Sequence, residues 1–340
     1  MMKLGDWQEI LRVPVDRLAF CSPVLRWLLF VACRIWGPTS EGHLTVHSPT
    51  GLEVDIDATP PALPSVTYYF HCPGPPRLPD VQKMMERSTT SSMSSGTPTT
   101  SHHNPSFGSD VQERDISCIL YPAQPRENEH GVQACHCIPH AKGIDYLRGL
   151  NIHRGVTAPL AVDNIDDVRN GLFLSDGLRT EWLRQTVGLL LIPNEYIRVQ
   201  DLTTPIFTAN PIPPDDVPRL VLNIFRNELL APMLRYSIHN NCVLRYTPSP
   251  SAVPAYLLDY VYICAVIAQF GSKDFPRTTW SPPPPPLVGP SSDKNFLSGR
   301  EMSTEHDGGD EEAEQSNWEI LTIIGAQNNP SLEAWRRGVE

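Results

Sequence analysis

The sequence lacks the local motifs that reveal many common enzyme activities. It contains no G-x-S-x-G nucleophile elbow, no glycine-rich phosphate loop and no H-E-x-x-H metal motif. It also lacks C-x-x-C pairs, because its eight cysteines are scattered along the chain. No N-glycosylation sequon occurs, since both Asn-Pro-Ser strings carry proline in the middle. These absences favour an intracellular protein with reduced thiols over a secreted disulfide scaffold.

The chain has no long hydrophobic run of the kind that crosses a membrane. The best candidate, residues 21–37, is too short and carries Arg26 and Arg34. Ser22-Pro23 favours a helix start and Gly37 a helix stop, so a buried amphipathic helix is predicted there. We therefore expect a protein that is neither secreted nor membrane-bound. The sequence leaves the choice between nucleus and cytoplasm open, and also the oligomeric state.

Positive charge is scarce, with 27 Lys and Arg residues against 38 Asp and Glu residues and a formal net charge of −11. This balance is unusual for a DNA-binding protein, because phosphate contacts need local positive charge. However, residues 301–319 hold eight acidic side chains and no Lys or Arg. Without this acidic run the chain is closer to neutral, so net charge neither supports nor excludes a nucleic-acid partner.

Proline and glycine, in contrast, are abundant, with 35 and 21 residues, which predicts long irregular segments. An N-terminal helix and β-hairpin unit is predicted for residues 1–72. Residues 73–114, rich in Ser and Thr, are predicted to be a disordered linker. Residues 115–202 form the central domain, and residues 203–272 form a C-terminal extension that packs on it through a helix. A Pro-rich, acidic tail without structure is predicted for residues 273–340.

Two features of this tail bear on possible partners. The uninterrupted proline run from Pro282 to Pro286 could hold a polyproline helix for a protein partner of the SH3 or WW type. Such runs also serve as simple spacers. The acidic run is predicted to be a solvated segment, with autoinhibition of a basic cleft as the alternative.

The central domain is predicted to contain two short strands followed by a helix. Residues 132–138 and 172–174 are strand-like, and Ser175 is placed to cap a helix that runs to about Arg184. Residues 116–121 are also strand-like. This order of elements brings the two strands and the helix together in one small α+β unit.

His136 is the candidate catalytic side chain of this unit. On a strand, successive side chains point to opposite faces, so His136 is expected to point away from Cys135 and Cys137 and to be available to solvent. Histidine suits a proton acceptor near neutral pH. Asn170-Gly171 precedes the second strand and is typical of a tight turn.

These residues resemble the HNH endonuclease family and, within it, a large fungal group of HNH-domain proteins. The resemblance rests on Cys118-Ile119-Leu120, on the string from Ala134 to Gly143, on the string from Ile165 to Leu174, on Pro193-Asn194 with Tyr196, and on the string from Leu257 to Tyr262. It implies a ββα-metal core and an endonuclease that hydrolyses DNA phosphodiester bonds with a divalent metal, Mg²⁺, Mn²⁺ or Zn²⁺.

The resemblance also implies roles for single residues. His136 would be the general base that takes a proton from water. Asn170 would form hydrogen bonds that orient this base. The last metal-binding histidine of the family would fall nine positions after Asn170, where this chain has Arg179. Arginine cannot coordinate a metal, because its guanidinium stays protonated.

Arg179 leaves several interpretations open. Asp176, one turn earlier on the predicted helix, could offer a carboxylate to Mg²⁺ or Mn²⁺, although an acidic residue there also simply favours the helix dipole. Arg179 could instead bind the substrate phosphate. It could equally mark a catalytically inactive HNH fold that is kept as a binding or interaction module.

A structural zinc site is a further hypothesis. Its four ligands would be Cys118, Cys135, Cys137 and His140, which is a common donor set for tetrahedral zinc. Such a protein would contain stoichiometric zinc after purification.

Overall fold

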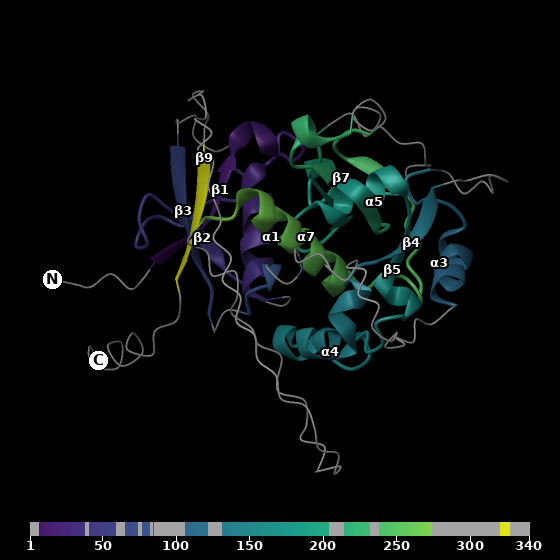
Figure 1. The fold of residues 1–340 in the computed structure, drawn as a ribbon. Helices are drawn as coiled ribbons and strands as arrows, with labels where there is room; N and C mark the ends of the chain where they lie inside the picture. The colour runs from purple at the N-terminus through teal and green to yellow at the C-terminus, as the bar shows by residue number, and fades with distance from the viewer. Residues whose placement is uncertain are drawn as a thin grey trace, which may run out of the picture.

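Two buried helices lie between small β-sheets in the computed structural model, which gives the chain an α+β architecture (Figure 1). The structure describes residues 7–37, 41–58, 65–73, 77–81, 84, 106–121, 131–203, 214–231, 238–273 and 320–326. Within these ranges no helix is both long and apolar enough to cross a membrane. The proline run at residues 282–286 and the acidic run at residues 301–319 fall outside the described residues.

The two central helices are α1 (Val24–Trp36) and α7 (Ala255–Phe270), which pack against each other. Both are apolar around most of their circumference, which is typical of helices covered on every side. The indole N–H of Trp27 donates to the hydroxyl of Tyr262 at 2.8 Å, which joins two buried polar groups of the two helices. The helix predicted at residues 21–37 and the helix predicted within residues 203–272 thus lie in the hydrophobic core.

Two arginines on α1 are buried, and each is neutralised by acidic side chains from other segments. Arg34 pairs with Asp259 of α7 at 2.9 Å and with Glu195 at 3.3 Å. Arg26 pairs with Asp57 at 2.5 Å. A buried charge is tolerated only where it is paired in this way. The arginines that make α1 unlike a membrane helix therefore tie it to the rest of the fold.

One side of the helical layer is covered by a four-stranded sheet with the order β1-β9-β3-β2. Its strands are β1 (Trp7–Pro14), β2 (His43–Val46), β3 (Ser65–His71) and β9 (Ile320–Ala326). β9 pairs antiparallel with β1 and parallel with β3. Residues 320–326 were expected to lie in a tail without structure, but they form strand β9 of this sheet. Their hydrogen-bond partners come from strands about 250 to 320 positions earlier, which no local pattern reveals.

A second sheet has the order β6-β7-β8 and is antiparallel throughout. It consists of β6 (Val187–Ile192), β7 (Arg219–Ile224) and β8 (Cys242–Leu244), and α7 packs against β6. The described residues also include α4 (Gly143–Arg154) and the short 3₁₀ turns η1 (Val15–Leu18), η2 (His140–Lys142), η3 (Val168–Asn170), η4 (Val199–Asp201) and η5 (Asn227–Leu229).

The central domain is built on β4 (Val132–His136), β5 (Gly171–Ser175) and α5 (Asp176–Leu183). β4 and β5 pair antiparallel, and α5 follows β5 without a break. A further helix, α3 (Phe107–Asp115), packs on this hairpin (Figure 1). α3 lies in the segment expected to be a disordered linker. It buries only Phe107 and Val111, so its apolar pattern is too weak to be recognised in the sequence.

Residues 116–121, expected to be a strand, form a loop instead. α3 ends at Ile116, whose φ of 65° turns the chain sharply. The guanidinium of Arg245 then holds the loop by donating to the backbone carbonyls of Asp115, Ser117 and Tyr121. These backbone groups are satisfied by one distant side chain rather than by a neighbouring strand.

Candidate functional site

The β4–β5 hairpin carries the candidate site, and its two faces have different surroundings. His136 pairs with Gly171 across the hairpin, and Cys135 pairs with Leu172. Because side chains alternate along each strand, His136 and Phe173 lie on one face while Cys135 and Leu172 lie on the other. We call these the α3 face and the α5 face, after the helix whose side chains contact each of them.

His136 lies on the α3 face in a restricted environment. Its ring stacks on Phe107 of α3, with ring centroids 3.8 Å apart and planes inclined by 7°. Its Nε2 lies 3.0 Å from Oδ1 of Asp166. The side chain is 12% exposed, so it is less open to solvent than the sequence suggested, because α3 covers this face.

Asp166 is a buried carboxylate placed between two imidazole rings. Its side chain is 5% exposed, and the same Oδ1 that contacts His136 lies 3.7 Å from Nε2 of His140. The two rings have centroids 5.6 Å apart and are inclined by 55°. A carboxylate at this range fixes the orientation of the ring that it contacts. Sequence reasoning assigned Asp166 no role, although it lies in the string that carried the family resemblance.

Asn170 joins the end of β4 to the loop that carries Asp166. Its amide oxygen accepts from the N–H of Ile138 at 2.9 Å, and its amide nitrogen donates to the carbonyls of Ile138 and Ile165 at 3.0 and 2.8 Å. Asn170 is fully buried, so all three bonds are shielded from water. Its side chain thereby fixes the strand that carries His136 relative to the loop that carries Asp166. None of the three hydrogen bonds is made to His136 or Asp166 itself.

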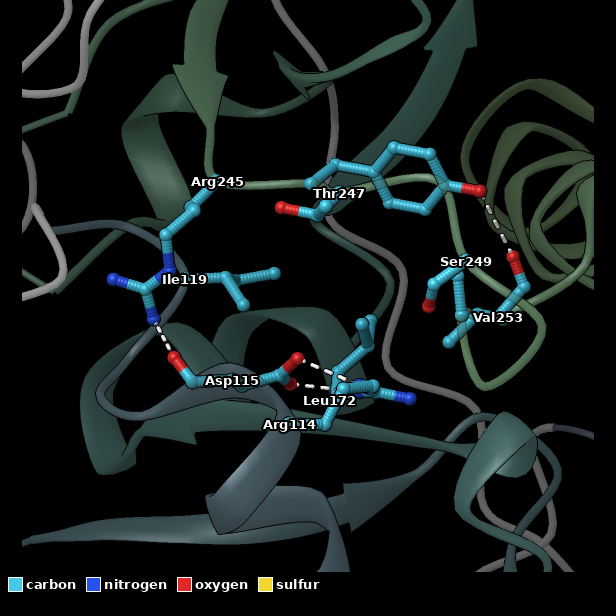
Figure 2. Close-up of a pocket in the computed structure, with 10 residues that line it drawn as sticks. Arg114, Asp115, Ile119, Leu172, Arg245, Thr247, Ser249 and Val253 are labelled. Carbon is cyan, nitrogen blue, oxygen red and sulfur yellow. Dashed lines mark hydrogen bonds and ion pairs between the residues drawn. The ribbon is translucent and has the colours of Figure 1, made fainter.

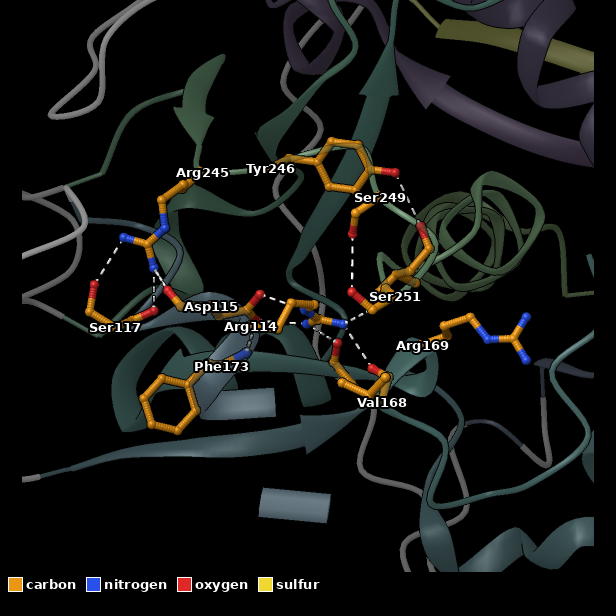
Figure 3. Close-up of polar contacts among 12 residues, drawn as sticks. Arg114, Asp115, Ser117, Val168, Arg169, Phe173, Arg245, Tyr246, Ser249 and Ser251 are labelled. Atoms are coloured by element: carbon orange, nitrogen blue, oxygen red, sulfur yellow. Dashed lines mark hydrogen bonds and ion pairs between the residues drawn. The ribbon is translucent and has the colours of Figure 1, made fainter. Parts of the chain in front are cut away.

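Arg114 also binds the backbone of the chain segment that contains Asn170 (Figure 3). Its guanidinium donates to the carbonyls of Val168 and Gly171 at 2.7 and 2.6 Å, which flank Asn170. It also donates to the carbonyl of Ser251 and to both carboxylate oxygens of Asp115. These bonds use all five guanidinium hydrogens. No sequence motif marks Arg114, because its partners are mostly backbone carbonyls.

The α5 face holds Arg179 and Cys135 rather than the histidine. Burial raises the pKa of the Cys135 thiol to about 11, although the charge of Arg179 and a hydrogen bond from it lower that pKa. Cys135 is therefore a neutral thiol at physiological pH. Asp176 is exposed, and its Oδ1 accepts from Nε2 of Gln133 at 2.6 Å. Asp176 and Arg179 thus contact residues of β4 on the face opposite to His136.

The donor set does not fit a chelated metal ion. Across the described residues, no three His, Cys, Asp or Glu side chains are grouped so that they could hold one. The zinc hypothesis fails in its details as well. Cys118, Cys135, Cys137 and His140 are not grouped in this way, and the sulfur of Cys118 accepts from the N–H of Ser175 at 3.1 Å. The described part of the chain thus offers no grouped ligands for zinc at the residues that the hypothesis named.

A pocket of about 180 Å³ lies beside the hairpin but away from His136 (Figure 2). It is lined by Arg114, Asp115, Leu172, Arg245 and residues of the segment before α7. Arg114 has no remaining donor, as its hydrogens already go to protein oxygens. We therefore do not regard this pocket as the reactive centre, since none of the histidines that could move a proton lines it.

The comparisons with known proteins give one match. Residues 114–189 match the model of the HNH endonuclease family. The matched segment runs from the last turn of α3 into β6 and includes His136, Asp166, Asn170 and Arg179. No curated protein and no solved structure matches the chain. The family recognised from the sequence is therefore confirmed for this segment, and an HNH endonuclease domain indicates nuclease activity.

Proposed function

We propose that this HNH segment hydrolyses phosphodiester bonds of DNA, with His136 as the general base. The observation that carries the proposal is the pairing of His136 with the buried carboxylate of Asp166, 3.0 Å away. A histidine oriented by a carboxylate is a common arrangement for taking a proton from a nucleophile, here water. Its place within the matched segment supports the same reading.

Asn170 supports this role as the residue that orients the base. Its three buried hydrogen bonds keep the end of β4 against the loop of Asp166. Rigid placement matters, because a general base works only within hydrogen-bond reach of the proton that it removes. The two-stranded hairpin followed by α5 provides the order of elements expected of a ββα core, and we include that assignment in the proposal.

The proposal is tested by nicking of supercoiled plasmid DNA. The protein is assayed in EDTA and with Mg²⁺, Mn²⁺ or Zn²⁺, beside the His136→Ala variant. We expect nicking by the wild-type protein and a loss of about 10²-fold or more in the variant, which is the usual contribution of a general base. An unchanged rate in His136→Ala would remove His136 from the mechanism and point to a contaminating nuclease.

A second candidate function is a catalytically inactive HNH module that binds nucleic acid or protein. The observation that favours it is Arg179, which contacts the Cys135 thiol at the position where the family would have a metal ligand. This reading predicts no nicking by the wild-type protein in any of the conditions above. It also predicts DNA binding, measured by fluorescence anisotropy, that His136→Ala leaves unchanged.

A further inference from the structure

The segment that joins β8 to α7 beside the pocket carries a signal outside the proposed catalytic site. In the described part of the chain, serine or threonine precedes proline at Ser22, Ser48, Thr247 and Ser249. Ser22 and Ser48 lie in bends, and Ser249 opens a turn in which its carbonyl accepts from the N–H of Ala252 at 3.0 Å. Of these four described residues, Thr247 alone lies outside a bend or turn, and it is exposed.

The Thr247 hydroxyl lies at the same pocket as the guanidinium of Arg245, two positions earlier (Figure 2). None of the described residues forms a hydrogen bond with this hydroxyl, whereas that of Ser249 contacts the hydroxyl of Ser251 at 3.1 Å. Arg245 donates to the hydroxyl of Ser117 and to backbone carbonyls, which are neutral acceptors. The segment therefore presents an accessible hydroxyl and a permanent cation on one pocket.

We propose that Thr247 is a phosphorylation site for a proline-directed protein kinase, and that Arg245 binds the phosphate. Kinases of this class require proline directly after the acceptor, which Pro248 supplies. Proline also keeps the residue before it out of the helical conformation, so Thr247 is suited to the extended chain that a kinase binds. This modification is separate from the proposed reaction at His136 and does not depend on it.

The group transfer uses ATP as the phosphoryl donor. Oγ1 of Thr247 forms a bond to the γ-phosphorus, while the bond from that phosphorus to the β–γ bridging oxygen breaks and ADP leaves. The hydroxyl proton passes to the catalytic base of the kinase. The product carries a charge of about −1.5 to −2 at pH 7 and three strong acceptor oxygens.

Arg245 can bind this phosphate although it already has partners. Its guanidinium donates to the carbonyls of Ser117 and Tyr121 at 2.6 and 2.8 Å. Hydrogen bonds between ionised partners are roughly twice as strong as those between neutral ones, so the phosphate competes well for the same N–H groups. The pocket volume of about 180 Å³ leaves room for a phosphate group. Arg114 lines the same pocket and adds positive charge, which Asp115 offsets in part.

Phosphate binding by Arg245 would loosen the end of α3. Arg245 also donates to the carbonyl of Asp115, the last residue of that helix. A guanidinium drawn to the phosphate gives up backbone carbonyls that it satisfies in the unmodified protein. Because Phe107 of the same helix stacks on His136, the modification acts on the helix that covers the proposed base. We therefore expect faster hydrogen exchange in α3 after phosphorylation.

The test uses the full-length protein with a purified mitogen-activated protein kinase, Mg²⁺ and ATP. Mass spectrometry locates each phosphate, because further Ser-Pro and Thr-Pro pairs occur outside the described residues. A synthetic peptide of residues 242–253 is the reference substrate. We expect phosphate on Thr247 of the wild-type protein and of the matched control Ser249→Ala. Thr247→Ala removes this phosphate and thereby assigns its ³¹P signal.

A pH titration followed by ³¹P NMR then tests the partner. We expect the pKa of the Thr247 phosphate to be lower in the folded protein than in urea, since a nearby cation favours the dianion. Equal pKa values would overturn Arg245 as the partner, and unchanged hydrogen exchange would overturn the link to α3. The site itself would be overturned by phosphate on the peptide but not on Thr247 of the folded protein, by phosphate on Ser249 instead, or by no phosphate on either substrate.

Discussion

The two faces of the β4–β5 hairpin differ in what the chain has placed on them. The α3 face holds His136, stacked on Phe107 and bonded to Asp166. The α5 face holds Cys135 beside Arg179, where the family would have a metal ligand. The first face contains groups that can exchange protons near neutral pH, and the second contains a neutral thiol and a permanent cation. The two faces of one short hairpin therefore carry groups of different chemistry, because a different helix packs against each of them.

The largest loss of stability is expected from changing Asn170, which connects the end of β4 to the loop that carries Asp166. Asn170→Ala leaves the N–H of Ile138 and two carbonyls without their buried partner. Because each lost partner costs about 1–3 kcal/mol, we expect the free energy of unfolding to fall by roughly 3–6 kcal/mol. Chemical denaturation measures this change. The control is Asn227→Ala, an exposed asparagine in η5, which should change stability by less than about 0.5 kcal/mol. Equal effects in the two variants would contradict the role given to Asn170.

On the α3 face, Phe107→Ala removes the ring that covers His136. Phe107 is 4% exposed, so we expect a loss of about 3 kcal/mol from its lost burial. Hydrogen exchange should show faster opening of α3 and β4 than of α5, since the ring lies only on the α3 face. If α5 opens equally, the two faces do not behave as separate packing regions.

On the α5 face, the Cys135 thiol makes stability depend on alkaline pH. Burial raises its pKa from 9.0 to about 11, so the folded state holds the proton more tightly than the unfolded state. Its contribution is fully present below pH 9 and is lost as the pH rises through about 11, by about 2–3 kcal/mol. Cys135→Ala should therefore flatten the decline in stability between pH 9 and 11, as measured by denaturation at several pH values. An identical decline in the variant would assign the effect to the other buried thiols.

The smallest effect is expected from Asp176→Ala, also on the α5 side. Its carboxylate is exposed and accepts a hydrogen bond from the Gln133 side chain. Such a surface contact contributes little, so stability should change by less than about 0.5 kcal/mol. Plasmid nicking should remain at the wild-type rate. A loss of nicking comparable to that of His136→Ala would instead make Asp176 part of the reaction and the α5 face part of the site.

Local patterns in the sequence were sufficient for the elements that carry strong periodicity or capping signals. The helices at α1 and α7, the strands β4 and β5 and the start of α5 follow from such signals. Local sequence patterns were insufficient where an element is stabilised by residues that are distant in the sequence. α3 depends on the hairpin that it covers, β9 depends on β1 and β3, and the loop after α3 depends on Arg245.

The same distinction applies to the candidate site. His136, Asn170 and the exceptional Arg179 could be named from the sequence, because they occupy positions of a recognisable motif. The motif assigned no part to Asp166, His140, Phe107 or Arg114. Phe107 lies 29 positions before His136, and Asp166 lies 30 positions after it, so neither spacing predicts contact.

The sequence by itself determined the order of the hairpin and α5, the family of residues 114–189 and the identity of the residue at position 179. Tertiary structure alone decided which groups surround His136 and on which face Arg179 lies. The physical reason is that strand alternation fixes only that neighbouring side chains point in opposite directions. The side chains that each face contacts depend on the helix that packs against it. That packing buries apolar surface contributed by distant parts of the chain.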